Sequence, residues 1–283
     1  MHQPLHPSPA AAPGRLRPAW PAWLRSREGR QWFVPALLLV AWDLGFRFGL
    51  FHTNLFPTPE GVVNAVVRLW QNGELVRDLT ISTERALAGF ALGGAIGFGL
   101  GLLNGLFRVG EELLDTTIQM VRNVPHLALM PLVILWFGIG ESTKVFLVAL
   151  GVFFPIYLNT FHGIRSIDPD LVQMGRIYGL TRWQLFRHII FPGALPSILN
   201  GIRFSLGLMW LTLIVAETVA SSSGIGYMSM NAREFLQTDV ILLGILLYAL
   251  LGKIADSLVR LLERRLLRWH PTQAKLSAQP KTA

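Results

Sequence analysis

Ionisable side chains stand within apolar stretches at positions where they could attract or bind a solute. Arg203 lies inside one such stretch, where a cation would favour a passing anion, and Glu217 lies near the far end of the same stretch. His126 lies between Pro125 and another apolar run. Because a charge at membrane depth is costly unless it is paired or hydrated, such residues are candidate functional sites. We therefore predict Arg203, Glu217 and His126 as residues of a translocation path.

Each of these residues also has a structural interpretation. The long side chain of Arg203 could reach the inner membrane interface or cap backbone carbonyls, and His126 could be a hydrogen-bonded histidine at the interface. For both we favour the structural role. Glu217 precedes a Ser-Ser-Ser-Gly turn at 221–224, so it could hold an outer gate, contact a partner protein or only pack.

Four other charges within the apolar stretches have partners on the same helical face. Asp43 and Arg47 are four residues apart, and Lys253 and Asp256 are three apart. Side chains at these spacings are neighbours on a helix, so we predict two structural ion pairs.

Catalytic and metal-binding patterns are absent from the sequence. It has no cysteine, and its seven histidines show no H-E-x-x-H or other metal spacing. Neither G-x-S-x-G nor the nucleotide-binding pattern G-x-x-x-x-G-K-[ST] occurs. We predict that the chain is not an enzyme, binds no cofactor itself, and leaves any nucleotide chemistry to a partner.

Composition identifies the elements that position these residues as membrane helices. Of the 283 residues, 52% are hydrophobic and 15% are charged, a combination that soluble domains rarely show. A helix needs about 20 mostly apolar residues to cross a bilayer. We predict an all-α polytopic membrane protein with six spans, of which the third is the weakest because it contains two prolines: 32–51, 83–107, 122–139, 143–163, 195–219 and 239–262.

Positive charges indicate the orientation. With the N-terminus inside, the inner segments carry seventeen Lys and Arg residues and the outer segments carry five. The positive-inside rule then places both termini in the cytoplasm and explains the net charge of +8 without nucleic acid.

The predicted spans and the segments between them divide the chain into four parts. Residues 1–30 form a flexible cytoplasmic tail, 31–78 the first span and an outer amphipathic segment, 79–263 the main transmembrane domain, and 264–283 a cytoplasmic tail. In the outer segment, Thr58 and Pro59 predict a helix start, and the helix should lie along the outer interface.

Glycines recur every four residues in the second predicted span. This spacing draws a smooth stripe down one helical face and lets another helix approach closely. The stripe could pack within the bundle or across a dimer, and it consists of Gly89, Gly93, Gly97, Gly101 and Gly105.

A polar stretch, GRIYGLTRWQLFRHIIFPGALPSI, interrupts the apolar pattern on the inner side. Asp168 followed by a proline starts a short helix, and Gly179 ends it. Thr181 with Gln184 three residues later is a capping box, which starts a second helix that should end before Pro192. The stretch therefore predicts two short helices joined at a glycine.

The order of residues here resembles the cytoplasmic coupling loop of ABC importer permeases. After Gly179 come nine residues, Ile189, one residue, Phe191 and Pro192, and the family pattern is Glu-Ala-Ala, three residues, Gly, nine residues, Ile, one residue, Leu-Pro. The resemblance implies that the loop 164–192 docks into a cleft on an ATP-binding subunit. The residues that it implies for this coupling are Gln173, Met174, Gly175, Tyr178, Gly179, Leu180, Arg182, Ile189 and Pro192.

The first part of the pattern departs from the family. Gln173-Met174-Gly175 stands where Glu-Ala-Ala is expected. Gln173 keeps the size of Glu and loses its charge, and Gly175 weakens a helix by up to about 1 kcal/mol relative to Ala. The alternative to docking is a basic amphipathic loop that rests on anionic lipid headgroups.

The wider sequence, from about residue 32 to residue 270, is similar to the alkanesulfonate permeases in the nitrate, sulfonate and taurine branch of that family. The resemblance implies a type I importer permease fold in the bacterial inner membrane, surrounded by lipid. It also implies a permease homodimer, two ATP-binding subunits that hold ATP and Mg²⁺, and a periplasmic solute-binding protein. The alternatives are the same architecture importing taurine, nitrate or another small anion and, more remotely, a secondary transporter or an intramembrane enzyme.

Overall fold

A computed structural model describes residues 27–49 and 56–269, and the regular elements within these ranges are all helical. The chain divides into two compact units after residue 50. The predicted tail 1–30 lies outside the described residues up to residue 26, as does the C-terminal tail beyond residue 269. An all-α fold was predicted and is confirmed for the described ranges.

Helix α2 (Arg27–Arg47) belongs to the first unit and corresponds to the first predicted span. Arg47 Nε donates a hydrogen bond to Asp43 Oδ2 at 2.7 Å, which confirms the predicted ion pair. The last two residues of that predicted span, 50 and 51, lie outside the described residues.

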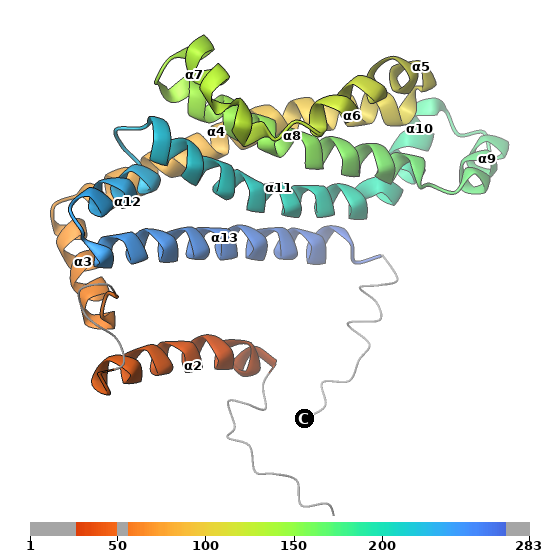
Figure 1. Ribbon diagram of the computed structural model, residues 1–283. Helices are drawn as coiled ribbons and strands as arrows, with labels where there is room; N and C mark the ends of the chain where they lie inside the picture. The colour runs from red at the N-terminus through yellow and green to blue at the C-terminus, as the bar shows by residue number, and fades with distance from the viewer. Residues whose placement is uncertain (1–26, 50–55, 270–283) are drawn as a thin grey trace, which may run out of the picture. The chain divides into compact units, whose positions relative to one another are not determined.

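The second unit contains the helices that are long and apolar enough to cross a membrane. Within the described ranges there are four, or five if a bent pair counts as one, so the predicted number of six stays a prediction. The four are α4 (Glu74–Leu106), α8 (Glu141–Arg165), the run Arg182–Ala220 that ends in α11 (Phe191–Ala220), and α13 (Thr238–Leu266). Figure 1 shows α4, α8, α11 and α13 as long neighbouring rods.

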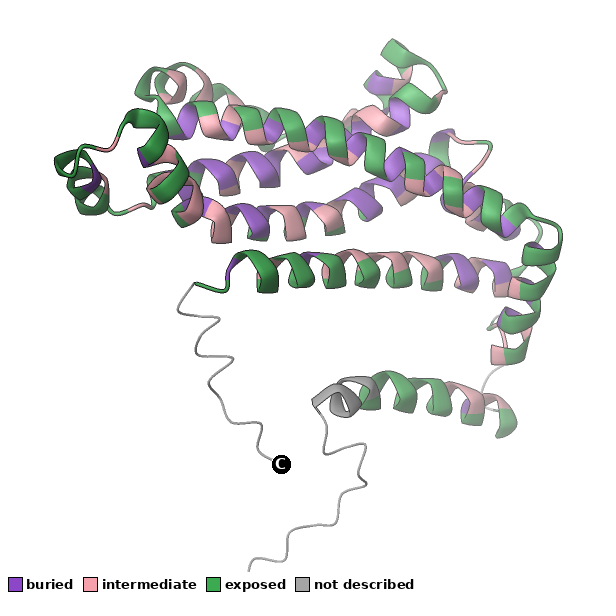
Figure 2. Cartoon of the chain, turned by 180° about the vertical axis from the view of Figure 1, so that it is seen from behind, coloured by how far each residue is buried: buried purple, intermediate pink, exposed green. Residues whose placement is uncertain are grey.

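Helix α8 is the centre of this bundle because it packs on both α4 and α11. Its side chains Val148 and Val152 contact Met209 and Leu213 of α11 in one buried apolar cluster. Figure 2 shows the burial concentrated along α8 and α11, whereas α13 is more exposed. In lipid such contacts stabilise by close packing rather than by removal from water.

The glycine stripe of α4 faces α8 within the same chain. All five stripe glycines are buried. A Cβ atom built on Gly89 would lie 2.5 Å from Val148 Cγ1, and one on Gly97 would lie 2.6 Å from the carbonyl oxygen of Phe153. Because these distances are too short for real contacts, only glycine allows the two helices to come this close along their length.

The third predicted span, 122–139, is bent, and whether it crosses the membrane stays a prediction. Helix α6 (Thr116–Arg122) ends there, a 3-10 turn (η2, His126–Leu129) follows, and α7 (Met130–Phe137) has only eight residues. The segments Arg108–Arg122 and His126–Phe137 meet at 81°. Pro125 precedes η2 and cannot donate a helical hydrogen bond, so the chain turns at the place where the helix would have continued.

The segment before this bend starts earlier than predicted. It consists of a short helix α5 (Arg108–Gly110), a π turn η1 (Glu111–Asp115) and α6. It is tied to α8 by polar contacts: Tyr157 donates a hydrogen bond to Asp115 Oδ1 at 2.8 Å, and Arg165 forms an ion pair with Glu111.

Two shorter helices cover one end of the bundle. Helix α3 (Pro59–Gln71) starts as predicted, because Thr58 Oγ1 accepts a hydrogen bond from Gly61 N at 3.0 Å. Helix α12 (Ile225–Glu234) follows α11 after the turn 221–224. The helices α9 (Pro169–Ile177) and α10 (Arg182–Leu185) lie at the other end.

Candidate coupling site

The helix stop predicted at Gly179 is a complete C-terminal cap. Gly179 has φ +78°, a left-handed conformation that glycine adopts without a steric penalty. Its N–H donates to the carbonyl of Arg176 at 3.0 Å, and the N–H of Leu180 donates to the carbonyl of Gly175 at 3.0 Å. These are the two hydrogen bonds of a Schellman motif, so α9 ends at a defined angle.

The second helix begins with the capping box that the sequence predicts. Thr181 Oγ1 accepts from Gln184 N at 3.3 Å, and Gln184 Oε1 accepts from Thr181 N at 2.9 Å. Asp168 caps the first helix in the same way, by accepting from Asp170 N at 2.9 Å. Both helix starts are therefore fixed by short-range hydrogen bonds.

The predicted end of this second helix before Pro192 is wrong. A π turn, η3 (Phe186–Ile190), carries the chain from α10 directly into α11. Its signature is the hydrogen bond from Phe191 N to the carbonyl of Phe186, five residues back. We attribute the continuation to this extra residue, which shifts the hydrogen-bond register just before the proline that lacks a donor.

Gly175 lies where the two short helices meet. It is buried, and a Cβ atom there would lie 2.7 Å from Ile189 Cδ1 and 2.9 Å from Leu185 Cδ1. Glycine at this position lets the side-chain ends of Leu185 and Ile189 pack directly on α9, and an alanine would require these flexible ends to shift.

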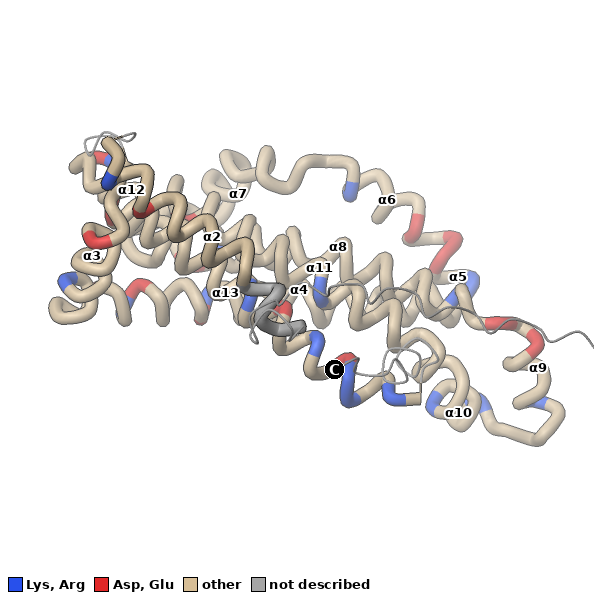
Figure 3. The backbone as a smooth tube through the Cα atoms, turned by 90° about the horizontal axis from the view of Figure 1, so that it is seen from below, with Lys and Arg blue, Asp and Glu red and all other residues tan. Residues whose placement is uncertain are grey.

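The outward side of the joint is apolar and exposed. Tyr178 is 80% exposed, and Leu171, Met174, Ile177 and Trp183 are also exposed. Figure 3 shows both basic and acidic positions at this end of the bundle. The basic ones on α9, α10 and η3 are Arg176, Arg182 and Arg187, and the acidic ones at the start of α9 are Asp168 and Asp170. A patch of large apolar side chains rimmed by charge is typical of a surface that another protein covers. Gln173 is exposed on the same helix, while Ile189 and Pro192 are partly buried.

Arg203 forms ion pairs with α13. Its Nη2 lies 2.7 Å from Glu263 Oε2, and its Nε lies 3.3 Å from Asp256 Oδ1. The predicted pair of Lys253 with Asp256 is wrong, since Asp256 pairs with Arg203 and with Arg260 at 2.6 Å. Asp256 thus has one partner across the helix interface, Arg203, and one on its own helix four residues later, Arg260.

His126 contacts the middle of α11. Its Nε2 lies 3.1 Å from Thr212 Oγ1, and the ring also lies next to Gly151 of α8. The structure therefore places His126 at a junction between η2, α8 and α11, where its hydrogen bond holds the bent segment to the bundle.

Glu217 lies in a buried cluster at the end of the bundle opposite to α9 and α10. Arg85 Nη1 lies 2.8 Å from Glu217 Oε1, and Ser82 Oγ, Gly226 N and Tyr248 OH donate to the same carboxylate. Arg203, Glu217 and His126 are thus held in separate places, and their role in a translocation path stays a prediction.

Arg85 was not among the predicted site residues and was counted only as one of the five outer cations. The available signal was spacing: Asp78, Ser82 and Arg85 lie at i, i+4 and i+7 and so share one face of α4. All three are buried. A polar stripe on an otherwise apolar helix indicates buried partners, but it does not identify them.

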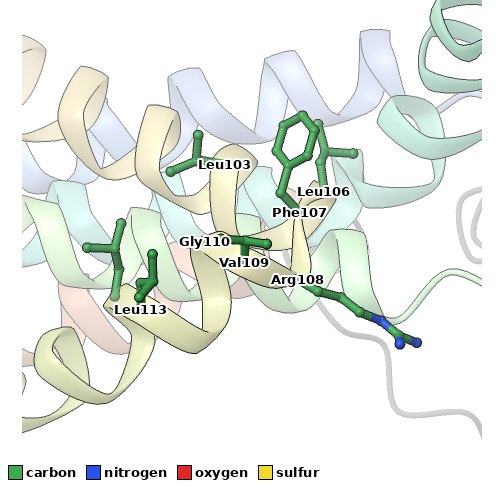
Figure 4. Close-up of a pocket in the computed structure, with 8 residues that line it drawn as sticks. Leu103, Leu106, Phe107, Arg108, Val109, Gly110 and Leu113 are labelled. Atoms are coloured by element: carbon green, nitrogen blue, oxygen red, sulfur yellow. The ribbon is translucent and has the colours of Figure 1, made fainter.

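An apolar hollow of about 550 Å³ lies where α4 turns into α5 (Figure 4). Leucine, valine and phenylalanine side chains line it, and Figure 4 shows the Arg108 guanidinium pointing away from the leucines. Arg108 is the charged residue among those that line the hollow, and the rest of its lining is apolar. No set of three or more His, Asp or Glu residues in the described ranges could hold a metal ion.

Comparison with known proteins identifies the family. Residues 93–268, more than half of the chain, match the model of binding-protein-dependent transport system inner membrane components. The chain belongs to this family of permeases. Family membership makes it the membrane permease of an ABC importer rather than an enzyme, because ATP hydrolysis belongs to a separate subunit.

Curated relatives match most of the permease. It is 62% identical over 240 residues to the putative aliphatic sulfonates transport permease SsuC of Escherichia coli K12. This alignment covers 85% of this chain and 91% of the relative. The corresponding protein of Bacillus subtilis 168 is 46% identical over 257 residues, covering 91% and 90%. The taurine transport permease TauC of Escherichia coli K12 is 35% identical over 242 residues, covering 83% and 87%.

Solved structures share the fold at low identity. The permease aligns with a chain of an amino acid ABC transporter at 16% identity and a TM-score of 0.59, covering 71% of this chain and 97% of that one. It aligns with a chain of the MetNI methionine ABC transporter at 20% identity and a TM-score of 0.53, covering 66% and 94%. The importer permease fold implied by the resemblance is confirmed.

Proposed function

We propose that the permease forms the translocation pathway for aliphatic sulfonates and receives the force of ATP hydrolysis through the loop 164–192. The observation that carries the coupling role is the exposed apolar patch on the joint between α9 and α10. A rigid joint with Tyr178 and Trp183 exposed is suited to docking, because tryptophan and tyrosine anchors supply much of the binding energy at protein interfaces. The ATP and Mg²⁺ belong to the docked subunit.

The substrate class rests on the relatives. Identity is 62% to a permease named for aliphatic sulfonates and 35% to one named for taurine, so the sulfonate assignment is the better supported. Taurine, nitrate or another small anion in the same architecture is the alternative that the test must separate.

The assembly and orientation follow from the family and the charge distribution. The cations at the α9 and α10 end and at the end of α13, which includes Arg264 and Arg265, favour a cytoplasmic location for that end. We place both termini in the cytoplasm and α3 and α12 on the outer side. Two copies of the permease, two ATP-binding subunits and a periplasmic solute-binding protein complete the proposed importer in the inner membrane.

Growth tests the substrate. A strain without this permease should not grow with an alkanesulfonate as sole sulfur source, and the gene should restore growth. Growth defects confined to taurine or to nitrate would assign the permease to a sister system.

Copurification tests the docking role. Trp183→Ala should reduce recovery of the ATP-binding subunit in detergent by about tenfold or more, because buried tryptophans are frequent hot spots. Trp136→Ala is the matched control, since Trp136 is comparably exposed but lies on α7. Equal recovery with both variants would contradict docking at the loop.

A further inference from the structure

Arg85 uses its guanidinium to join three parts of the permease. Its Nε and Nη2 contact the two oxygens of Glu141 at 2.5 and 2.6 Å, which is a bidentate pair. Its Nη1 donates to Glu217 at 2.8 Å and to the carbonyl of Ser223 at 2.7 Å, and Nη2 also donates to Ser223 Oγ at 2.9 Å. Arg85 on α4 therefore holds the start of α8, the end of α11 and the turn 221–224 together.

The turn that Arg85 holds is also fastened through its backbone. Gly224 N donates to Asp78 Oδ1 at 3.1 Å, and Ile225 N donates to Ser82 Oγ at 2.8 Å. The N–H groups at the start of α12 are thus satisfied by side chains of other helices rather than by a local cap: those of Gly224 and Ile225 by α4, and that of Gly226 by Glu217 of α11. Glycine is required at 224, where φ is +105° and a side chain would collide with Glu217.

The charges in this cluster balance. Arg85 and Lys144 are buried, and they face the carboxylates of Glu217 and Glu141. Glu141 contacts both cations, yet its side chain is 64% exposed, whereas that of Arg85 is 4% exposed. Because Arg85 has two acceptors from Glu141 at fixed geometry, Glu141 orients the guanidinium so that its other N–H groups point at the turn.

The turn 221–224 follows a long continuous helical run, which we call the lever. The helical run Arg182–Ala220 has 39 residues and begins in the loop 164–192 at the opposite end of the molecule. The partner elements α4 and α8 are packed together along the glycine stripe and form a rigid base. Arg85 therefore fastens one end of the lever to the base, while the other end carries the docking surface.

We propose that Arg85 is a positioning residue for coupling and that Glu141 orients it. The cluster acts as the fixed point about which movement of the loop 164–192 is converted into opening of the pathway. This inference rests on the proposed docking of the ATP-binding subunit at that loop. When the anchor is weakened, ATP hydrolysis continues and solute import per ATP falls.

Arg85→Lys is the main test because it keeps the positive charge and removes the planar guanidinium that bonds Glu141 and the turn at the same time. In the complete importer reconstituted in liposomes, with ethanesulfonate as solute, import per ATP hydrolysed should fall about tenfold, which matches the loss of a charge-assisted hydrogen bond. Glu141→Gln should give a smaller loss in the same direction. Glu74→Gln is the matched control, because Glu74 is also an exposed acid at the start of a helix but lies outside the cluster.

A rescue experiment separates anchoring from general damage. The natural chain has no cysteine, so Ser142→Cys and Ser222→Cys can be joined by a bis-methanethiosulfonate reagent next to Glu141 and Ser223. Both serines are exposed, and neither takes part in the hydrogen bonds of Arg85. In the Arg85→Lys background this link should restore import per ATP to within about twofold of the wild-type value, and a reductant should abolish the rescue.

The outcomes distinguish this inference from the proposed function. Wild-type import per ATP in Arg85→Lys, or a linked protein that stays defective while the ATP-binding subunit copurifies, would overturn the anchor. Loss of copurification in Trp183→Ala but not in Arg85→Lys would support docking and anchoring as separate steps. Normal docking in Trp183→Ala would instead contradict the proposed function.

Discussion

The two ends of the long helical run Arg182–Ala220 are stabilised in opposite ways. At the α9 and α10 end, the joint is fixed by backbone caps at Gly179 and Thr181, and its large apolar side chains are exposed. At the α12 end, buried charges hold a turn through side chains of three helices. In our proposal the first end docks on another protein, whereas the second is held by contacts within the chain.

Removal of Glu217 should have the largest effect on stability. Its side chain is buried, and Glu217→Ala would remove one of the two carboxylates paired with Arg85 and leave Gly226 N and Tyr248 OH without this acceptor. Breaking a buried ion pair in this way costs about 3–5 kcal/mol. The thermal midpoint of the detergent-purified permease should fall by many degrees. Glu234→Ala, at an exposed acid on α12, is the control and should leave it nearly unchanged.

A proline at the joint should abolish coupling while leaving the bundle intact. Gly179→Pro demands φ near −65° where the chain has +78°, and it removes the N–H that caps α9, at a local cost of about 3 kcal/mol. Membrane insertion and thermal stability should be retained, and solute import should be lost. Gly179→Asn, which tolerates the left-handed conformation, should retain most import. Normal import by the proline variant would contradict the role of the joint.

The rigid base between the two ends can be tested with matched glycines on α4. A Cβ on Gly93 would meet the backbone of Ala149, so Gly93→Ala should destabilise the permease by about 1–3 kcal/mol. A Cβ atom on Gly99 would have no neighbour within 4 Å, so Gly99→Ala should be neutral or slightly stabilising. Equal thermal midpoints for the two variants would show that the close approach of α4 to α8 is not required.

The smallest effect is expected at the docking surface itself. Gln173 is exposed, so Gln173→Glu should change stability by less than about 0.5 kcal/mol. We expect ATP-driven import to change by less than about twofold, because the apolar patch carries the docking in our proposal. A large gain of import would mean that the ATP-binding subunit offers a cation at this position.

The contrast between the two ends also explains what the sequence could predict. The joint depends on rules that act within a few residues, so the stop at Gly179 and the capping box at Thr181 were predicted correctly. The Arg85 cluster joins residues more than 130 positions apart, and spacing on α4 reveals a polar face without naming Glu217 as the partner. Competing partners caused the wrong pairing of Asp256, which has Arg203 within reach on another helix.

Proline was informative but ambiguous. At Pro125 the chain turns sharply, as the absence of a donor predicts, so the predicted span 122–139 is bent there. At Pro192 the helix continues, because the π turn η3 changes the hydrogen-bond register just before it. A π turn contains one more residue than an α-helical turn, and no local pattern in the sequence predicts it.

That extra residue also sets the direction in which the docking surface points. Each residue of an α-helix turns the chain by about 100°. Deleting one residue from η3 would convert it to α-helix and swing α9 and α10 by roughly that angle around the axis of α11, while α11 kept its own neighbours. The direction in which Tyr178 and Trp183 point, measured around the axis of α11, is therefore set by five residues, Phe186–Ile190.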